Sequence, residues 1–235
     1  MDEKLKRHCS VIIPAAGQGK RMGTNIKKQY LKIGDKPIIL HTIEKFIKLP
    51  SIDEVIVVIA KEDIEYFNNQ ILKHSDFKHK IKITAGGKER QESVYNGLMT
   101  ISDNTEFVLI HDAARPFVSE KDINKLIEAT IIYGACVLGV KVKDTIKIAD
   151  EENYICNTPD RNKLWAIQTP QGFKKDIILE AHKKAKEDNY IGTDDGVLAE
   201  RLGYRVKIIE GSYENIKITT AEDLLIGETI IKNLQ

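Results

Sequence analysis

Residues 11–23 have the sequence VIIPAAGQGKRMG, an apolar run that passes into small residues and then into two cations. The apolar run predicts a short buried strand that ends at Pro14. The small residues let a ligand lie against bare backbone, where consecutive N–H groups can hold phosphate oxygens. Lys20 and Arg21 add positive charge, and an arginine can bind a phosphate through two hydrogen bonds. The segment predicts a nucleotide site with chemistry at the phosphates; a tight turn into a helix is the alternative.

Two better-known phosphate-binding loops do not match this segment. A P-loop continues from Gly-Lys with Ser or Thr, whereas Gly19-Lys20 is followed by Arg21. The dinucleotide fingerprint needs a third glycine where Met22 stands, and Gly23 comes one position late. NTPases of the P-loop type and dehydrogenases are therefore disfavoured.

The composition predicts one large domain, residues 1–235, with no nucleic-acid or membrane partner. The chain has 42% hydrophobic residues and a net charge of +1, so it offers no strongly basic character for nucleic acid. No stretch approaches a membrane span, and the first apolar run is too short for a signal peptide. Cys9, Cys136 and Cys156 are widely spaced, which is typical of reduced cysteines in a cytoplasmic protein.

Strand-like and helix-like segments alternate along the chain. Apolar runs predict strands at Glu54–Ala60, Ile81–Thr84, Phe107–Ile110, Ala135–Val140 and Arg205–Ile209. Helices are expected near Ile38–Lys48, Asp63–Lys73, Gln91–Thr100 and Glu120–Tyr133. This alternation predicts an α/β fold with a mostly parallel sheet and helices on both faces. Ligands of such sheets bind beyond the carboxyl ends of the strands, where residues 14–23, 86–87 and 111–112 all fall.

Residues 141–165 break the alternation and predict a protruding β-arm. Polar and apolar residues alternate there around a turn-like stretch at residues 150–153. A two-stranded arm is marginal by itself, so we expect a homodimer in which the arm is exchanged between copies. The alternative is an arm folded over its own domain.

The remaining segments predict further helices and one short strand. Trp165–Phe173 leads to a helix at Lys174–Glu187, and Thr193 can cap the next helix, with Asp194 and Asp195 in its first turn. Residues 215–220 predict a short strand in which Lys217 points away from its two isoleucine neighbours. A C-terminal helix is expected from about residue 221.

Seven motifs occur in order along nearly the whole chain. They are Ala15-Ala16-Gly17-x-Gly19-x-Arg21-Met22-Gly23 with Lys28-Gln29-Tyr30, Gly86-Gly87-x-x-Arg90-x-x-Ser93-Val94, His111-Asp112-Ala113-Ala114-Arg115-Pro116, Asp144-Thr145, Asp160-Arg161, Gln168-Thr169-Pro170-Gln171 and Asn215-Ile216-Lys217-Ile218-Thr219. Together they resemble the 2-C-methyl-D-erythritol 4-phosphate cytidylyltransferases of the non-mevalonate isoprenoid pathway. The nearest alternative is the ribitol-5-phosphate cytidylyltransferases of teichoic acid synthesis. The pairs Ala15-Ala16 and Ala113-Ala114 favour the former.

The resemblance implies a Rossmann-like nucleotidyltransferase sheet, Mg²⁺ as cofactor, and transfer of CMP from CTP to 2-C-methyl-D-erythritol 4-phosphate. The acceptor phosphate would attack the α-phosphorus in line, with pyrophosphate as the leaving group. Catalysis of such a transfer is mostly positioning and charge stabilisation. The attacking phosphate is already ionised, so no general base is needed.

The resemblance also implies roles for individual residues. It assigns phosphate contacts in catalysis to Arg21, Lys28 and Lys217. It assigns nucleotide binding to Pro14, Ala15, Ala16, Gly17, Gly19, Gly86, Gly87, Ser93 and Ala113. It assigns acceptor binding to Asp112, Arg115, Thr145 and Arg161, with Asp112 also a candidate magnesium ligand. Thr145 and Arg161 would come from the arm of the partner copy.

Each role has a plainer alternative. Arg21 could be a solvated loop cation, Lys217 an outward-facing lysine, and Ser93 a first-turn helix residue. Arg161 could be the partner of Asp160 or Glu151 in a salt bridge. His111 and Arg90 are expected to be structural, and Lys27 to be surface charge. Asp194 and Asp195 are expected to cap a helix, with a second metal role as the alternative.

Two other function classes remain to be weighed against the enzyme. A glycosyltransferase with a similar fold carries Asp-x-Asp for its metal, and this sequence has no such pair. A non-catalytic nucleotide-binding regulator would be expected to lose charged phosphate contacts, yet Arg21, Lys28 and Lys217 are all present.

Overall fold

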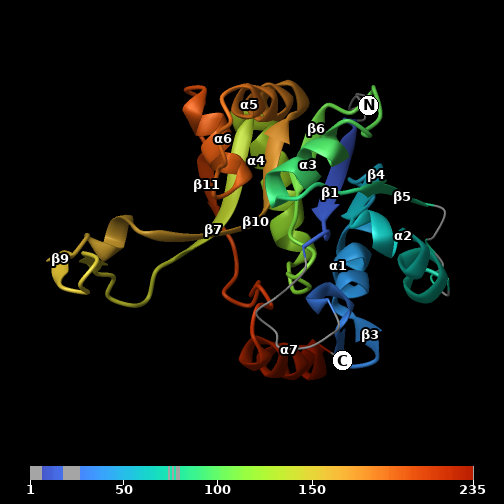
Figure 1. Ribbon diagram of the computed structural model, residues 1–235, viewed down its shortest axis with the longest axis horizontal. Coiled ribbons are helices and arrows are strands. Elements are labelled where there is room, and N and C mark those ends of the chain that lie inside the picture. The colour runs from blue at the N-terminus through green and yellow to red at the C-terminus, as the bar shows by residue number, and fades with distance from the viewer. Residues whose placement is uncertain (1–6, 18–26, 74, 76, 78–79, 235) are drawn as a thin grey trace, which may run out of the picture.

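The computed structural model describes residues 7–17, 27–73, 75, 77 and 80–234. A seven-stranded sheet with the order β11-β7-β10-β6-β1-β4-β5 forms its centre (Figure 1). The strands are β1 (Cys9–Pro14), β4 (Glu54–Ile59), β5 (Ile81–Ala85), β6 (Phe107–Ile110), β7 (Ala135–Lys141), β10 (Trp165–Lys174) and β11 (Lys207–Glu210). The helices that pack on it are α1 (Ile38–Ile47), α3 (Arg90–Leu98), α4 (Glu120–Tyr133), α5 (Lys175–Glu187) and α6 (Asp195–Arg201).

The sheet is mostly parallel, as predicted. β1 pairs in parallel with β4 and β6, β4 with β5, and β11 with β7. β10 is the exception, because it runs antiparallel between β6 and β7. The sequence did not predict this strand: the polar run Gln168–Gln171 lies at its centre, where the pairing with β7 shifts register.

Helices cover both faces of the sheet because buried residues of the central strands alternate between two apolar clusters. Val11 and Ile13 of β1 belong to the cluster that α1 and α4 complete. Ile12, between them, belongs to the cluster that α3, α5 and α6 complete. Each of these three β1 side chains is fully buried, so one short apolar run holds both layers together.

The helix predicted at Asp63–Lys73 is present, but it is irregular and begins at Lys61. It comprises a 3₁₀ turn (Lys61–Asp63), α2 (Ile64–Tyr66) and a π-helical turn (Phe67–Ile71). A further 3₁₀ turn (Lys28–Tyr30) precedes the small hairpin of β2 (Lys32–Ile33) and β3 (Lys36–Pro37). α7 (Ala221–Leu234) packs on this hairpin and helps to bury Ile33 and Ile218.

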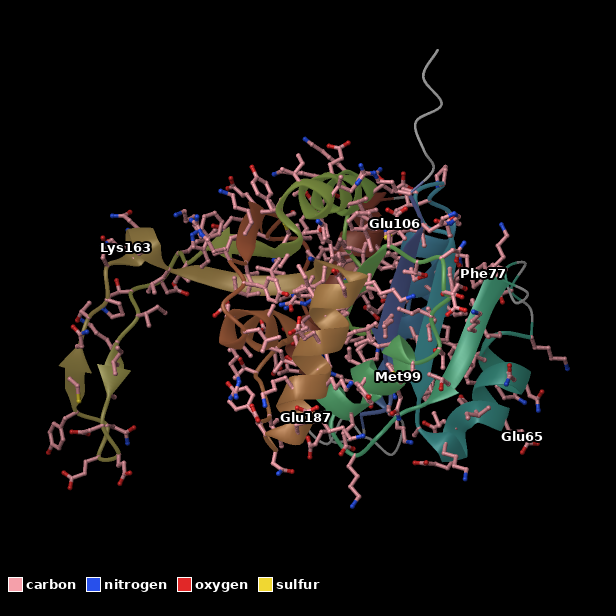
Figure 2. All side chains as sticks on the ribbon, turned by 90° about the horizontal axis from the view of Figure 1, so that it is seen from above. Glu65, Phe77, Met99, Glu106, Lys163 and Glu187 are labelled. Atoms are coloured by element: carbon pink, nitrogen blue, oxygen red, sulfur yellow. The ribbon has the colours of Figure 1, made fainter. Side chains whose placement is uncertain are left out.

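The predicted arm leaves the domain between β7 and β10. At its far end β8 (Ile148–Ala149) and β9 (Ile155–Asn157) pair antiparallel, and a 3₁₀ turn (Arg161–Lys163) lies nearer the domain. Figure 2 shows the arm, with Lys163 on it, standing clear of the other elements. Its large apolar side chains are exposed: Ile146, Ile148, Tyr154 and Ile155. The hairpin therefore buries little apolar surface within one chain. Among the described residues, no helix combines the length and apolar character that crossing a membrane requires.

Candidate active site

The predicted nucleotide-binding segments meet in one pocket beyond the carboxyl ends of β1, β5 and β6. The predicted site residues that line it are Pro14, Ala15, Ala16, Gly17, Lys28, Gly87, Ser93, Asp112, Ala113 and Lys217. Gly19 and Arg21 lie outside the described residues. Of the predicted site residues that the structure describes, all but Gly86, Arg115, Thr145 and Arg161 line this pocket, although they are far apart in the sequence.

Gln29, which the sequence analysis gave no role, fixes the loop after β1. Its buried side-chain amide donates from Nε2 to the carbonyl of Ala15 at 2.7 Å and to that of Gly17 at 3.3 Å. The N–H of Ala15 donates to the carbonyl of Val58 at 2.7 Å, which continues the ladder of β1. These hydrogen bonds fix the backbone of the small-residue loop, which forms one wall of the pocket. The only sequence signal for Gln29 was its place in the Lys28-Gln29-Tyr30 motif.

The turn at Gly86-Gly87 packs directly against this wall. A Cβ atom at Gly86 would overlap that of Ala16 and lie 2.8 Å from the Ser93 hydroxyl, so glycine is required for the close approach. Ser93 lies in α3, and its Oγ accepts from the N–H of Gly87 at 3.1 Å. Gly86 therefore lies behind the pocket, and Ser93 holds the turn. Contact of Ser93 with a base stays a prediction.

Asp112 is the electrostatic centre of the pocket. Nε of Arg90 lies 3.0 Å from its Oδ1, and Nζ of Lys217 lies 2.6 Å from its Oδ2. Burial alone would raise the pKa of this carboxyl, but the charges of Arg90 and Lys217 hold the pKa well below its usual range. Asp112 is therefore an anion that two cations share, and Arg90 belongs to the site's charge arrangement.

His111 is a structural hydrogen-bonding residue, as expected. Its Nε2 lies 2.9 Å from the carbonyl of Arg115, which can only accept, so this nitrogen carries the proton. Its Nδ1 lies 3.2 Å from Oγ1 of Thr169, a hydroxyl that already accepts from the N–H of Asp112 at 3.0 Å. Burial lowers the pKa of His111 to about 4, so the ring is neutral. A neutral His111 fixes the backbone on which Asp112 stands.

The prediction of a strand at residues 215–220 is wrong. Among the described residues, no strand pairs with this segment; buried side chains and a backbone bond to the loop after β6 hold it. Nδ2 of buried Asn215 donates to the carbonyl of Thr169 at 2.9 Å, and the N–H of Ile218 donates to that of Ala114 at 2.8 Å. Lys217 lies between these two anchors, which direct its side chain to Asp112.

The predicted acceptor-binding residues do not all reach the pocket. Nη1 of Arg115 donates to the carbonyl of Asn215 at 2.7 Å, so in this structure Arg115 supports the segment that carries Lys217. Thr145 and Arg161 are exposed on the arm and do not line the pocket of their own chain. Nη1 of Arg161 donates to the carbonyl of Lys143 at 2.9 Å. The roles of these residues in acceptor binding stay predictions.

Of the two acidic residues expected to cap a helix, only Asp194 does so. It caps α6 in place of Thr193, because its Oδ1 accepts from the N–H of Val197 at 2.9 Å. Asp195 is buried and faces inward, with Nη1 of Arg90 at 2.8 Å and Nε2 of His182 at 3.1 Å. No local pattern could pair Asp195 with partners so far away in the sequence.

Lys27 is also more than the surface charge that was expected. Its Nζ lies 2.7 Å from Asp63 and 3.2 Å from Glu62. These bonds tie the segment before Lys28 to the turn after β4, and the pKa of Lys27 is raised by them although burial opposes the rise.

The described residues contain no group of three or more His, Cys, Asp or Glu side chains that could hold a metal ion. Both oxygens of Asp112 already face cations. This donor set does not suit a metal held by protein side chains. It suits a cation that phosphate oxygens and water coordinate, with at most one carboxylate.

Known proteins share this sequence and fold. The family described as "IspD: 2-C-methyl-D-erythritol 4-phosphate cytidylyltransferase" matches residues 9–233. The chain belongs to this family. A cytidylyltransferase of this name from Caldanaerobacter subterraneus subsp. tengcongensis is 48% identical over 223 residues, covering 95% of this chain and 98% of that protein. One from Clostridioides difficile is 50% identical over 222 residues, covering 94% and 93%.

Solved structures of cytidylyltransferases also match nearly the whole chain. A 4-diphosphocytidyl-2C-methyl-D-erythritol synthase from Anaerococcus prevotii has a TM-score of 0.85 at 35% identity and covers 97% of both chains. The cytidylyltransferase from Francisella tularensis has a TM-score of 0.81 at 34% identity, covering 94% of this chain and 99% of that one. The Rossmann-like α/β fold that the motifs implied is therefore that of the cytidylyltransferase family.

Proposed function

We propose that this chain transfers CMP from CTP to 2-C-methyl-D-erythritol 4-phosphate, giving 4-diphosphocytidyl-2-C-methyl-D-erythritol and pyrophosphate. Membership of the cytidylyltransferase family supports this activity. The structural observation that carries it is the pairing of Lys217 with Asp112 inside a pocket walled by backbone. Such a pocket offers both a cation for a phosphate and fixed backbone groups for a base.

The chemistry needs charge placement more than proton transfer. The acceptor phosphate is an anion at neutral pH, and it attacks the α-phosphorus of CTP as the bond to pyrophosphate breaks. Lys28 and Lys217 line the pocket and would bind the phosphates and stabilise the negative charge that grows on pyrophosphate. Arg21 would act with them, as the family motif implies.

The base pocket is expected to select cytosine by size and by backbone contacts. Ala15, Ala16 and Gly87 line it with small groups, which leave room for a pyrimidine and bring backbone N–H and carbonyl groups close to its edge. Ser93 would add a hydroxyl. A purine, which is larger, is expected to be excluded.

The acceptor site is expected to be completed by a second copy of the chain. Thr145 and Arg161 do not line the pocket of their own chain, and the exposed apolar side chains of the arm lack a covering surface within it. Exchange of arms in a homodimer would bury those side chains and bring Thr145 and Arg161 to the partner's pocket. Asp112 and Arg115 would complete acceptor binding from the domain.

Magnesium is expected to enter with CTP. The ion would be coordinated mainly by triphosphate oxygens and water, with Asp112 as the nearest candidate carboxylate, and it would neutralise charge on the leaving pyrophosphate. A cytoplasmic location is in keeping with three free cysteines in the chain.

The alternative functions have less support. Relatives at 43–50% identity carry the methylerythritol name, which disfavours ribitol 5-phosphate as the acceptor. A non-catalytic regulator would not need a lysine paired with a buried carboxylate in the pocket.

Pyrophosphate release from CTP and Mg²⁺ tests the proposal when 2-C-methyl-D-erythritol 4-phosphate and ribitol 5-phosphate are assayed in parallel. Release that depends on methylerythritol phosphate is expected. Release only with ribitol 5-phosphate would keep the mechanism but reject the acceptor. No release with either would reject the activity.

A further inference from the structure

A row of charged and polar side chains in mutual contact runs from the pocket into the interior of the domain. Lys217 contacts Asp112 at 2.6 Å, Asp112 contacts Arg90 at 3.0 Å, and Arg90 contacts Asp195 through Nη1 at 2.8 Å. Asp195 in turn lies 3.1 Å from Nε2 of His182. The last three residues come from α3, α6 and α5, which pack on the same face of the sheet (Figure 1).

The inner end of this row of side chains is buried and held by hydrogen bonds. The side chain of Asp195 is 1% exposed and that of His182 is 0% exposed. Because an ionised carboxylate can only accept, Nε2 of His182 carries the proton of their bond. Gln171 of β10 accepts from the N–H groups of Asp195 and Gly196 at 3.1 and 2.9 Å, so the central sheet fixes the first turn of α6.

Arg90 therefore has two carboxylate partners, one inside the domain and one in the pocket. Nη1 faces Asp195 and Nε faces Asp112, so the interior contact sets the direction in which the guanidinium can reach the pocket. Its planar fork suits this bridging position, and a lysine could not make both contacts with the same geometry. The position of Asp112 thus depends on residues that do not line the pocket.

In the proposed function, this arrangement would keep Asp112 paired during turnover. When Lys217 turns to a substrate phosphate, Asp112 loses one of its two cations. A buried carboxylate without a partner is unfavourable and would move or take up a proton. Arg90 then remains in contact with Asp112 at 3.0 Å, and Arg90 is itself held by Asp195.

We infer that Asp195 and His182 are positioning residues for the transfer reaction: through Arg90 they keep Asp112 ionised and in place while Lys217 binds a substrate phosphate. This inference rests on the proposed function, because it assigns to Lys217 a change of partner during turnover. Neither residue touches the substrate. Their effect is on the geometry of Asp112 and therefore on turnover more than on the folding of the domain.

Asp195→Asn tests this role because it removes the charge and keeps the shape. We expect kcat per folded protein to fall roughly 10- to 100-fold, while the Kd for CTP changes by less than about threefold, because Asp195 does not line the pocket. Glu54→Gln is the matched control. Glu54 is also a largely buried carboxylate paired with a lysine, Lys82. It lies at the amino end of β4, away from the pocket, so the Glu54→Gln variant should be less stable but keep its kcat.

His182 gives a second, independent pair of variants. His182→Gln can still donate to Asp195 from its side-chain amide, whereas His182→Leu cannot. We expect the glutamine variant to keep kcat within about threefold of wild type and the leucine variant to fall roughly tenfold or more. Equal kcat values for these two variants, or for Asp195→Asn and Glu54→Gln, would overturn the positioning role.

A crystal structure of Asp195→Asn separates this inference from the proposed function. The inference predicts that Arg90 leaves its position between residues 112 and 195 and that the side chain of Asp112 shifts. An unchanged contact between Arg90 and Asp112 would overturn it, whatever the activity. A wild-type protein that releases no pyrophosphate would reject the proposed function, and the crystal structure would still decide whether Asp195 positions Asp112.

Discussion

Nζ of Lys217 lies 2.6 Å from Oδ2 of Asp112, in an ion pair between a segment that precedes α7 and one that follows β6. The pair keeps a cation in the pocket without exposing an uncompensated buried carboxylate. A phosphate that binds Lys217 must compete with this carboxylate for the same ammonium group. The ion pair is therefore the contact that substrate binding is expected to change first.

Lys217→Ala should reduce kcat by roughly 100- to 1,000-fold, because it removes a cation aimed at the charge that develops during transfer. The fold should persist, since Asp112 keeps Arg90. Lys125→Ala is a suitable control: its Nζ also makes a bond, to the carbonyl of Glu210 at 2.9 Å, but on α4. Steady-state kinetics with circular dichroism would check both. A folded Lys217→Ala variant with near-normal kcat would exclude the catalytic role.

Arm exchange predicts complementation between two inactive variants. Lys217→Ala damages the domain's site and Arg161→Ala damages the arm, so a mixed dimer would contain one site built from two intact parts. Random mixing should then restore about one quarter of wild-type activity. The measurement is the activity of the two chains coexpressed with different tags. Activity no higher than that of the separate variants would show that the arm does not act in the partner's site.

His111 should make the stability depend on pH. Its pKa falls from 6.5 to about 4 in the folded chain because of burial. As the pH falls below 6.5, the unfolded chain takes up a proton that the folded chain does not, so the free energy of unfolding decreases. The decrease should be about 2 kcal/mol between pH 7 and pH 5.

Urea unfolding at the two pH values measures this effect, with His111→Gln as the control. The glutamine variant is expected to be less stable but to lose that part of the pH dependence, since the other histidines are unchanged. Equal pH dependence in both proteins would mean that His111 titrates normally when folded.

Asp194 and Thr193 should differ in their contribution to stability, because only Asp194 caps α6. Asp194→Ala should lower the free energy of unfolding by about 1 kcal/mol, because it removes the acceptor for the N–H of Val197. Thr193→Ala should change it by less than about 0.5 kcal/mol. Chemical denaturation of the two variants checks the assignment. The reverse order would restore Thr193 as the cap.

The sequence predicted the parts of this protein whose signals are local. The run Val11–Ile13 predicted a buried strand, and the motifs after β1, β5 and β6 met in one pocket because carboxyl ends of parallel strands share an edge. β10 escaped prediction because its polar centre, Gln168–Gln171, has no strand periodicity. The polar side chains of these residues are buried and form hydrogen bonds with distant segments, such as that of Gln171 with α6.

The errors also have long-range causes. Alternation at residues 215–220 is typical of a strand, but Asn215 and Ile218 are held by bonds to Thr169 and Ala114 in place of a ladder. Asp195 followed a capping residue and was expected to share its role, yet its partners Arg90 and His182 come from two other helices. Only the folded chain brings such partners together.

Identification of the phosphorylated product tests the central claim most directly. The protein is incubated with CTP labelled at the α-phosphorus, Mg²⁺ and 2-C-methyl-D-erythritol 4-phosphate, and the products are separated and examined by phosphorus NMR and mass spectrometry. The account predicts that the label appears in a diphosphate ester joining cytidine to methylerythritol, in equal amount to the pyrophosphate released. Label found only in free CMP, or retained in CTP, would contradict it.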